Sequence, residues 1–210
     1  MRVSKAKAAE NRQHILTAAA RLFREQGVGA TGVDSIAENA GLTHGAVYSQ
    51  FGSKEAIATE AIRLALVQSK HLWQRIAERK GEKDAFPAIV DQYLSPAHRD
   101  SAGRGCVFAA LACEVARQPD SVRGVLTGEF KNALEFLAEL NPTEDSSNSY
   151  DDAIATFVSM TGALILARAI NDRTLSNRIL KTTAERLTKR TGRPRVRTRS
   201  PHSARPKTAG

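Results

Sequence analysis

Residues 31–54 read TGVDSIAENAGLTHGAVYSQFGSK, and this stretch decides the fold. It predicts two short helices joined by a tight turn at Gly41, where a left-handed backbone is easily adopted only by glycine. A third helix follows, capped at Ser53. Apolar side chains recur three and four residues apart in the first short helix and form one stripe along it: Val33, Ile36, Ala37 and Ala40.

The cap residues divide this stretch into its helices. We expect Thr31 to cap the first short helix, with Asp34 three residues later at its positive end. Thr43 is the expected N-cap of the second short helix. Val47 and Phe51 lie four residues apart on that helix and are expected to face inward.

The second short helix, which Thr43 caps, suits the major groove of DNA. This groove is roughly 12 Å wide and admits a helix whose first residues meet the base edges. Tyr48 and Lys54 are suited to backbone phosphates. An ordinary helical hairpin would carry a similar pattern, so the pattern alone leaves both readings open. The residues predicted to contact DNA are Thr31, Thr43, His44, Gly45, Ala46, Tyr48, Ser49, Gln50 and Lys54.

With the helix that precedes it, the stretch resembles the TetR family of bacterial transcriptional regulators. The resemblance implies that residues 43–51 form the recognition helix of a homodimer, which binds DNA without a ligand and releases it with one. It rests on these positions: Ile15, Ala18, Ala19, Leu22, Phe23, Gly27, Thr31, Val33, Ile36, Ala37, Ala40, Gly41, Leu42, Gly45, Val47, Tyr48, Phe51, Ser53, Lys54 and Glu55.

The fold class we predict is all-α: an N-terminal three-helix helix-turn-helix domain and a C-terminal helical domain for ligand binding and dimerisation. Aromatic residues are few and alanines many, and no run is typical of a buried strand. The predicted domains are residues 9–69 (helix-turn-helix at about 32–51), 70–190, and a basic tail, 191–210. The expected helices are about 7–26, the two short ones, 53–79, 84–95, 104–117, 120–140, 150–170 and 174–190.

The positive charge is concentrated at the C-terminal end. The chain carries a net charge of +9, and residues 191–210 hold six Lys or Arg and no acid. We expect this tail to be disordered. Its GRPR, residues 192–195, is similar to the core of an AT-hook, which reads the minor groove. A solvated basic tail that adds non-specific phosphate contacts is the favoured alternative.

The last two expected helices are apolar over a wide face, which a surface helix does not need. They predict a dimer interface built from two helices of each subunit, with core packing in a monomer as the alternative. We expect an effector pocket among the middle helices, although plain core packing would explain the same residues. The candidate pocket residues are Trp73, Phe86, Cys106, Phe108, Phe157 and Met160.

Several residues invite other chemistry. Cys106 and Cys113 are too far apart for a disulfide within one helix, but Cys106, near Arg104 at a helix start, could have a depressed pKa and sense oxidants or electrophiles. Glu114 could orient a ligand or pair with Arg117. The histidines lack metal-ligand spacing, and no nucleophile elbow, phosphate loop or catalytic carboxylate pair is present. We therefore expect no enzyme, no metal and no cofactor.

The leading hypothesis is a ligand-responsive homodimeric repressor, released from a palindromic operator in double-stranded DNA by an unknown small molecule. An architectural DNA-binding protein and a helical enzyme or scaffold are the alternatives. The longest apolar stretch, residues 157–167, is too short to span a bilayer, and the first residues are polar, so we expect a cytoplasmic protein without a membrane partner.

Overall fold

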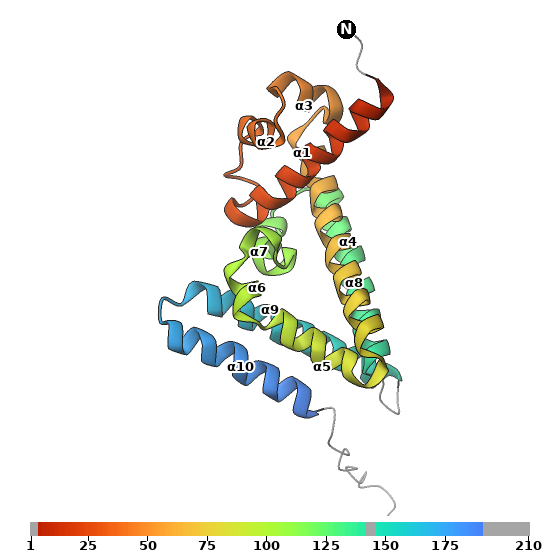
Figure 1. Ribbon diagram of the computed structural model, residues 1–210, viewed down its shortest axis with the longest axis vertical. Helices are drawn as coiled ribbons and strands as arrows, with labels where there is room; N and C mark the ends of the chain where they lie inside the picture. The colour runs from red at the N-terminus through yellow and green to blue at the C-terminus, as the bar shows by residue number, and fades with distance from the viewer. Residues whose placement is uncertain (1–3, 142–145, 191–210) are drawn as a thin grey trace, which may run out of the picture.

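The structure is a computed structural model and describes residues 4–141 and 146–190, within which every regular element is helical (Figure 1). This confirms the predicted all-α fold class. The elements are α1 (Lys5–Gln26), α2 (Val33–Ala40), α3 (His44–Phe51), α4 (Lys54–Lys80), α5 (Glu82–Tyr93), α6 (Pro96–Asp100), the 3-10 helix η1 (Ala102–Arg104), α7 (Val107–Val115), α8 (Asp120–Leu140), α9 (Ser146–Ala169) and α10 (Arg173–Arg190).

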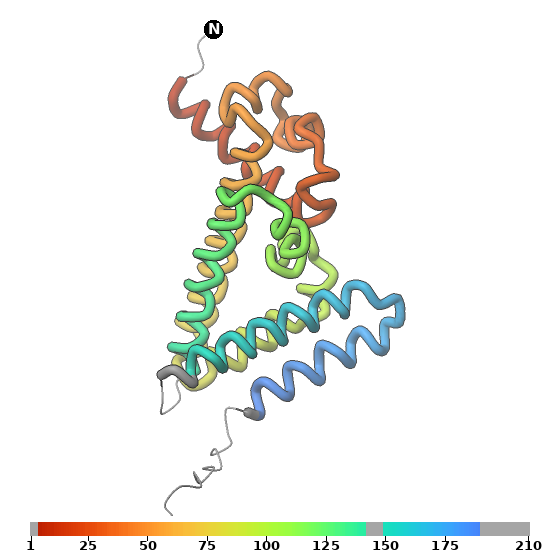
Figure 2. Tube along the Cα trace, turned by 180° about the vertical axis from the view of Figure 1, so that it is seen from behind, coloured from red at the N-terminus to blue at the C-terminus, as the bar shows by residue number. Residues whose placement is uncertain are grey.

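The helices are arranged in an open triangle (Figure 1). α1, α2 and α3 form one corner, and α4 runs from them along one edge with α8 at its side. α5 and α9 form the opposite edge, and α10 packs on the outer side of α9 (Figure 2). α7 lies between α1 and that edge, so it connects the upper corner with the lower helices.

Two clusters of buried apolar side chains form the core. The first joins α1 to α4 and also contains three residues of α7: Val107, Leu111 and Val115. The second lies among α4, α5, α8, α9 and α10. Phe108 packs against both clusters, so α7 bridges them.

The short helix α6 was not predicted from the sequence. Pro96 occupies its first turn, and Ser95 caps it by accepting a hydrogen bond from the amide of His98 at 3.1 Å. The buried guanidinium of Arg99 then anchors α6 to α10 by donating to Ser176 Oγ at 2.8 Å and Asn177 Oδ1 at 2.7 Å. This anchoring fixes the position of His98.

One described helix is long and apolar enough to cross a membrane by length and composition: α9, over Ser149–Ala169. Our expectation, based on the shorter stretch 157–167, missed this. A single such helix is weak evidence, because core helices of soluble proteins have the same properties. Here the buried side of α9 carries Phe157, Met160 and Leu164 into the second core cluster.

Candidate nucleic-acid interface and cavity

The turn between α2 and α3 follows the predicted chemistry. Gly41 adopts a left-handed conformation with φ 69° and ends α2, and its amide donates back to Glu38 O at 3.0 Å. Thr43 caps α3, because its Oγ1 accepts a hydrogen bond from the amide of Ala46 at 3.3 Å. Ser53 caps α4 in the same way through Ala56. The two short helices are therefore set by local bonds.

The inner side of α3 is fixed by α1 and α4. Val47 is fully buried. Arg12 of α1 donates to the carbonyl of Gln50 at 2.9 Å, and its guanidinium carbon lies 4.1 Å from the centre of the Phe51 ring. The same guanidinium binds Glu60 of α4, with Nη2 to Oε2 at 2.6 Å. α3 is thus held rigidly at its C-terminal end.

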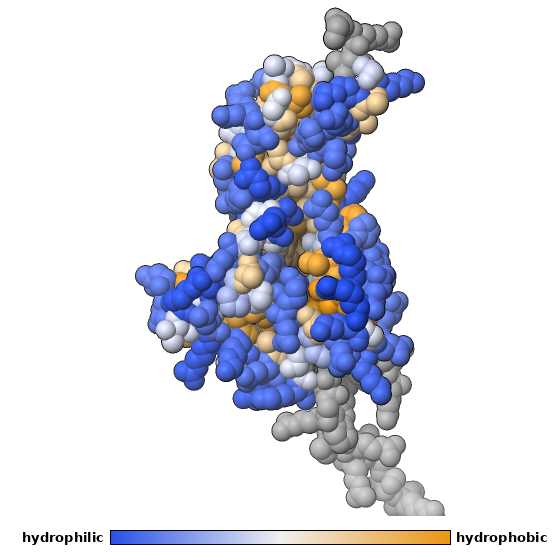
Figure 3. Space-filling view, in the orientation of Figure 1, coloured by the Kyte–Doolittle hydropathy of each residue, from blue (hydrophilic) through white to orange (hydrophobic). Residues whose placement is uncertain are grey.

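The outer side of α3 is open. Thr43, His44, Gly45, Tyr48 and Ser49 are exposed, and Tyr48 keeps 41% of its surface accessible. Figure 3 shows a largely hydrophilic face of the molecule, in which hydrophobic residues reach the surface in scattered patches.

His44 has partners on this outer side. Its Nδ1 pairs with the carboxylate of Asp34, and its ring lies 4.8 Å from that of Tyr48, centre to centre. The first turn of α3 therefore presents short or ring-shaped polar side chains. Of the remaining predicted contacts, Ala46 is half-buried.

Burial rules out one of the predicted DNA contacts, and a second has its side chain bonded to α1. Thr31 is fully buried, its Oγ1 donates to the carbonyl of Gly27 at 2.7 Å, and the N-cap of α2 is Gly32. Gln50 is half-buried and turns its amide toward α1, where Nε2 donates to the carbonyl of Ala8 at 3.1 Å. Lys54 stays a candidate, although its ammonium donates to the carbonyl of Gly29 at 3.2 Å.

A second feature is an open-mouthed cavity among α4, α5, α7, α8 and α9, with an empty volume of ≈ 720 Å³ that includes solvent at its mouth. Four of the predicted pocket residues line it: Trp73, Cys106, Phe108 and Phe157. The other two were wrong. Phe86 is buried outside the lining, and Met160 is fully buried in the second core cluster.

Aromatic rings form much of the cavity wall. Trp73 is stacked with Phe136 at 6.4 Å between ring centres and meets Phe157 edge-on at 6.2 Å. Phe157 in turn meets the edge of Phe108 at 5.0 Å. Tyr93 and Phe136 were not predicted, because their periodicity is that of ordinary helix packing and gives no signal of a cavity.

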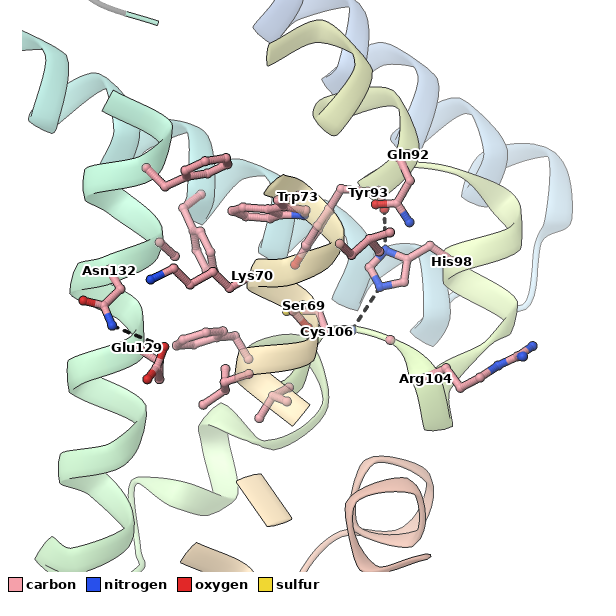
Figure 4. Close-up of a pocket in the computed structure, with 18 residues that line it drawn as sticks. Ser69, Lys70, Trp73, Gln92, Tyr93, His98, Arg104, Cys106, Glu129 and Asn132 are labelled. Carbon is pink, nitrogen blue, oxygen red and sulfur yellow. Dashed lines mark hydrogen bonds between the residues drawn. The ribbon is translucent and has the colours of Figure 1, made fainter. Parts of the chain in front are cut away.

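The cavity also has a polar side, which the sequence did not indicate. Lys70 extends from α4 toward α8, where Glu129 and Asn132 lie (Figure 4). Asn132 donates to Glu129 Oε2 at 3.3 Å. Arg104 also lines the cavity, but its side chain points away from Lys70, Glu129 and Asn132 (Figure 4). A bound molecule would therefore meet apolar rings inside and one charge of each sign on this side.

The opposite wall is made of hydrogen-bonded groups. His98 donates from Nδ1 to the carbonyl of Tyr93 at 2.7 Å and accepts at Nε2 from the amide of Cys106 at 3.0 Å (Figure 4). Burial lowers the pKa of His98, and the nearby positive charge of Arg168 lowers it further. This pattern fixes the neutral tautomer with its proton on Nδ1.

The thiol of Cys106 does not have the low pKa that its place at a helix start suggested. Burial raises the pKa of this thiol above its ordinary value, and nearby hydrogen bonds from backbone amides and Tyr93 only partly oppose the rise. The expectation of a depressed pKa at Cys106 is therefore wrong. Cys113, within α7, is a free and exposed thiol.

The outer face of α9 and α10 is unusually apolar. Val158 keeps 59% of its surface exposed and Leu166 55%. Other large apolar side chains are exposed on the same pair of helices: Ile154, Ile165 and Leu175. Exposed groups of this kind are typical of surfaces that bind another protein.

Comparison with known proteins identifies the same N-terminal helices that the geometry suggests for DNA binding. Residues 15–61 match the model of the bacterial regulatory proteins of the tetR family. TtgW of Pseudomonas putida, described as an uncharacterized helix-turn-helix transcriptional regulator, is 40% identical over 98 residues, which cover 46% of this chain and 70% of that protein. AcrR of Shigella flexneri is 45% identical over 64 residues, or 30% of each chain.

The fold is shared with solved structures as well. A TetR-family transcriptional regulator from Cytophaga hutchinsonii superimposes with a TM-score of 0.75 at 18% identity, covering 90% of this chain and 98% of that one. With the family match and the relatives, the three-helix unit and its exposed α3 identify a DNA-binding transcriptional regulator. The chain belongs to the TetR family.

Proposed function

We propose that this regulator is a homodimeric repressor, which reads a palindromic operator with α3 and is released by a small molecule bound in the aromatic cavity. The proposal rests on one observation: the exposed side of α3 and the cavity are both accessible, and the single helix α4 connects them. α3 presents its polar side outward, and α4 runs without interruption from α3 to the cavity residues Lys70 and Trp73.

DNA reading is assigned to the exposed side of α3. Thr43, His44, Gly45, Tyr48 and Ser49 are accessible there, and few long side chains hinder close approach to a groove. Tyr48 and Lys54 are assigned to phosphates, Ala46 to the edge of the contact, and His44 to the base edges. The residues proposed for this domain are 9–69.

Dimerisation is assigned to the apolar outer face of α9 and α10. Pairing this face with its copy would remove Val158 and Leu166 from water and relate two copies of α3 by a two-fold axis. A palindromic operator follows from that symmetry. The same contact would cover the apolar side of α9, which favours a cytoplasmic protein over one that inserts α9 into a membrane.

Effector binding is assigned to the cavity, within a proposed domain of residues 70–190. The aromatic rings in its walls favour an aromatic molecule, and occupancy would shift α4 and hence the spacing of the two α3 helices. The basic tail and its GRPR motif lie outside the described residues. We propose that residues 191–210 add non-specific phosphate contacts.

DNA footprinting tests the proposal on the gene's own upstream region. A single palindromic footprint, lost on addition of a cavity ligand, is the expected result. Uniform coating that depends only on salt would instead identify an architectural protein. Trp73 is the one tryptophan of the chain and lines the cavity, so quenching of its fluorescence reports ligand binding without DNA.

A further inference from the structure

Glu114 is the one charged residue of α7, and it binds the backbone of the turn between α1 and α2. Its Oε2 accepts a hydrogen bond from the amide of Val28 at 2.8 Å, and its Oε1 accepts from the amide of Gly29. Both donors follow the end of α1 directly. Hydrogen bonds to a charged acceptor are about twice as strong as neutral ones, so the Glu114 contact ties α7 firmly to the DNA-binding part.

The turn is shaped to admit this carboxylate. Gly27 has φ 88°, and a Cβ placed on it would lie 2.8 Å from Glu114 Oε2. A Cβ on Gly29 would lie 3.1 Å from Oε1. Thr31 Oγ1 and Lys54 Nζ hold the carbonyl groups of Gly27 and Gly29 from the other sides. Glu114 therefore binds the amides of Val28 and Gly29 in a turn where the carbonyls of Gly27 and Gly29 already accept hydrogen bonds from other residues.

The opposite end of α7 lies in the cavity wall. Cys106, Val107 and Phe108 line the cavity, and Phe108 packs against the hydrophobic clusters of both parts of the molecule. Glu114 follows Phe108 by six positions, which is about 9 Å along a helix. One short rigid helix thus has a cavity residue at one end and a bond to the DNA-binding part at the other.

We propose that Glu114 is a positioning residue for DNA binding: it transmits displacements of Phe108 at the cavity, through α7, to the turn that leads into α2. The inference rests on the proposed role of the cavity. It adds a second route to α3 that does not pass along α4. A molecule that pushes Phe108 would move Glu114, loosen the amides of Val28 and Gly29, and change how α2 and α3 sit on α1.

The test needs neither an operator nor an identified ligand. Hydrogen exchange of the Val28 and Gly29 amides is measured by NMR in the full chain. Glu114→Gln should accelerate their exchange at least about tenfold, because an amide group offers only one acceptor and turns a donor toward the second N–H. Glu135→Gln, an exposed change on α8, is the matched control and should leave both amides unchanged.

Transmission is tested from the cavity end. Phe108→Trp enlarges and Phe108→Leu shrinks the side chain at the junction, so at least one should fold, as verified by circular dichroism. Either change should alter exchange at Val28 and Gly29 several-fold in the native background and leave it unaltered in the Glu114→Gln background. Equal responses in the two backgrounds, or none in the native one, would overturn the proposal.

Operator affinity separates this inference from the proposed function. If the exchange data support transmission but Phe108→Trp leaves operator affinity unchanged, Glu114 moves the turn without positioning α3 for DNA, and the positioning role is rejected while the proposed route from the cavity along α4 stands. If Phe108→Trp weakens operator binding equally with and without Glu114, the cavity regulates through α4 alone and the Glu114 route is rejected.

Discussion

The imidazole Nε2 of His98 accepts the amide hydrogen of Cys106 at 3.0 Å, directly before the first turn of α7. Protonation of this nitrogen would place an N–H group against another N–H group and break the bond. Arg168 donates to the carbonyls of His98 and Arg99 at 3.1 Å, so a second positive charge already lies beside the ring. The amide that precedes the first turn of α7 therefore needs a neutral His98 as its acceptor.

Stability should fall as this histidine becomes protonated. Because its pKa in the folded protein lies below the ordinary value of about 6.5, the unfolded chain binds the proton first as the pH falls. The stabilising contribution is fully present above about pH 6.5 and decreases below it. Urea unfolding at pH 7.5 and 5.5 should show a loss in the native protein and a smaller one in His98→Gln. An equal loss in both would assign the effect to other groups.

Gly41 should be needed only because its backbone adopts a left-handed conformation. A Cβ at this position would meet no atom within 4 Å, yet φ is 69°. Gly41→Ala should therefore lower the free energy of unfolding by about 1 kcal/mol through left-handed strain. Thermal or urea unfolding measures this. No loss of stability would mean that the turn between α2 and α3 adopts another conformation.

Gly45 provides the opposite case on the neighbouring helix. It lies within α3, and a Cβ there would also meet no atom within 4 Å. Gly45→Ala should raise stability by about 0.5–1 kcal/mol, because alanine favours a helix. Operator affinity should nevertheless fall, since the added methyl group stands on the side proposed to enter the groove. A more stable variant with full operator affinity would contradict the placement of Gly45 at the DNA.

The local features of the helix-turn-helix were predictable because their causes are close in sequence. Thr43 bonds an amide three residues away, as does Ser53, and the left-handed turn needs only Gly41. The prediction that Thr31 caps α2 was wrong, although threonine is a suitable N-cap residue. Its hydroxyl bonds backward to Gly27 in the preceding turn, and no local rule distinguishes that partner from the helix ahead.

The cavity and the Glu114 contact depend on distant parts of the chain. Glu114 binds an amide 86 residues earlier, and sequence spacing offered only ligand orientation or pairing with Arg117. Tyr93 and Phe136 became cavity residues because α5 and α8 meet α4 at the same level. Periodicity indicates which side of a helix is buried, but it does not distinguish a filled core from a hollow one.

Tyr48 and Gln50 should behave differently although both lie on α3. Tyr48 is exposed, and Tyr48→Ala should weaken binding to all DNA sequences by a similar factor, on the order of tenfold, if its hydroxyl meets a phosphate. Gln50 is bonded to Ala8, so Gln50→Ala should lower stability by about 1 kcal/mol and leave the preference among operator variants unchanged. Binding titrations on an operator and its single-base variants, with unfolding measured alongside, separate the two. A change of base preference in Gln50→Ala would show that its side chain rotates toward DNA.

Val158 offers the most direct test of the proposed dimer, because it is a large apolar residue near the middle of α9 with 59% of its surface exposed. Val158→Glu would place a carboxylate of each subunit in the proposed interface and remove both from water, which should weaken association by about a hundredfold or more. Because the side chain is exposed in the single subunit, the fold itself should survive, with unchanged circular dichroism. Gln68→Glu, an exposed change on α4, controls for the added charge. Analytical ultracentrifugation should find the native protein and Gln68→Glu as dimers and Val158→Glu as a folded monomer with weak operator binding. A Val158→Glu dimer of native affinity would place the interface elsewhere, since a charged pair could not be buried there without a measurable penalty.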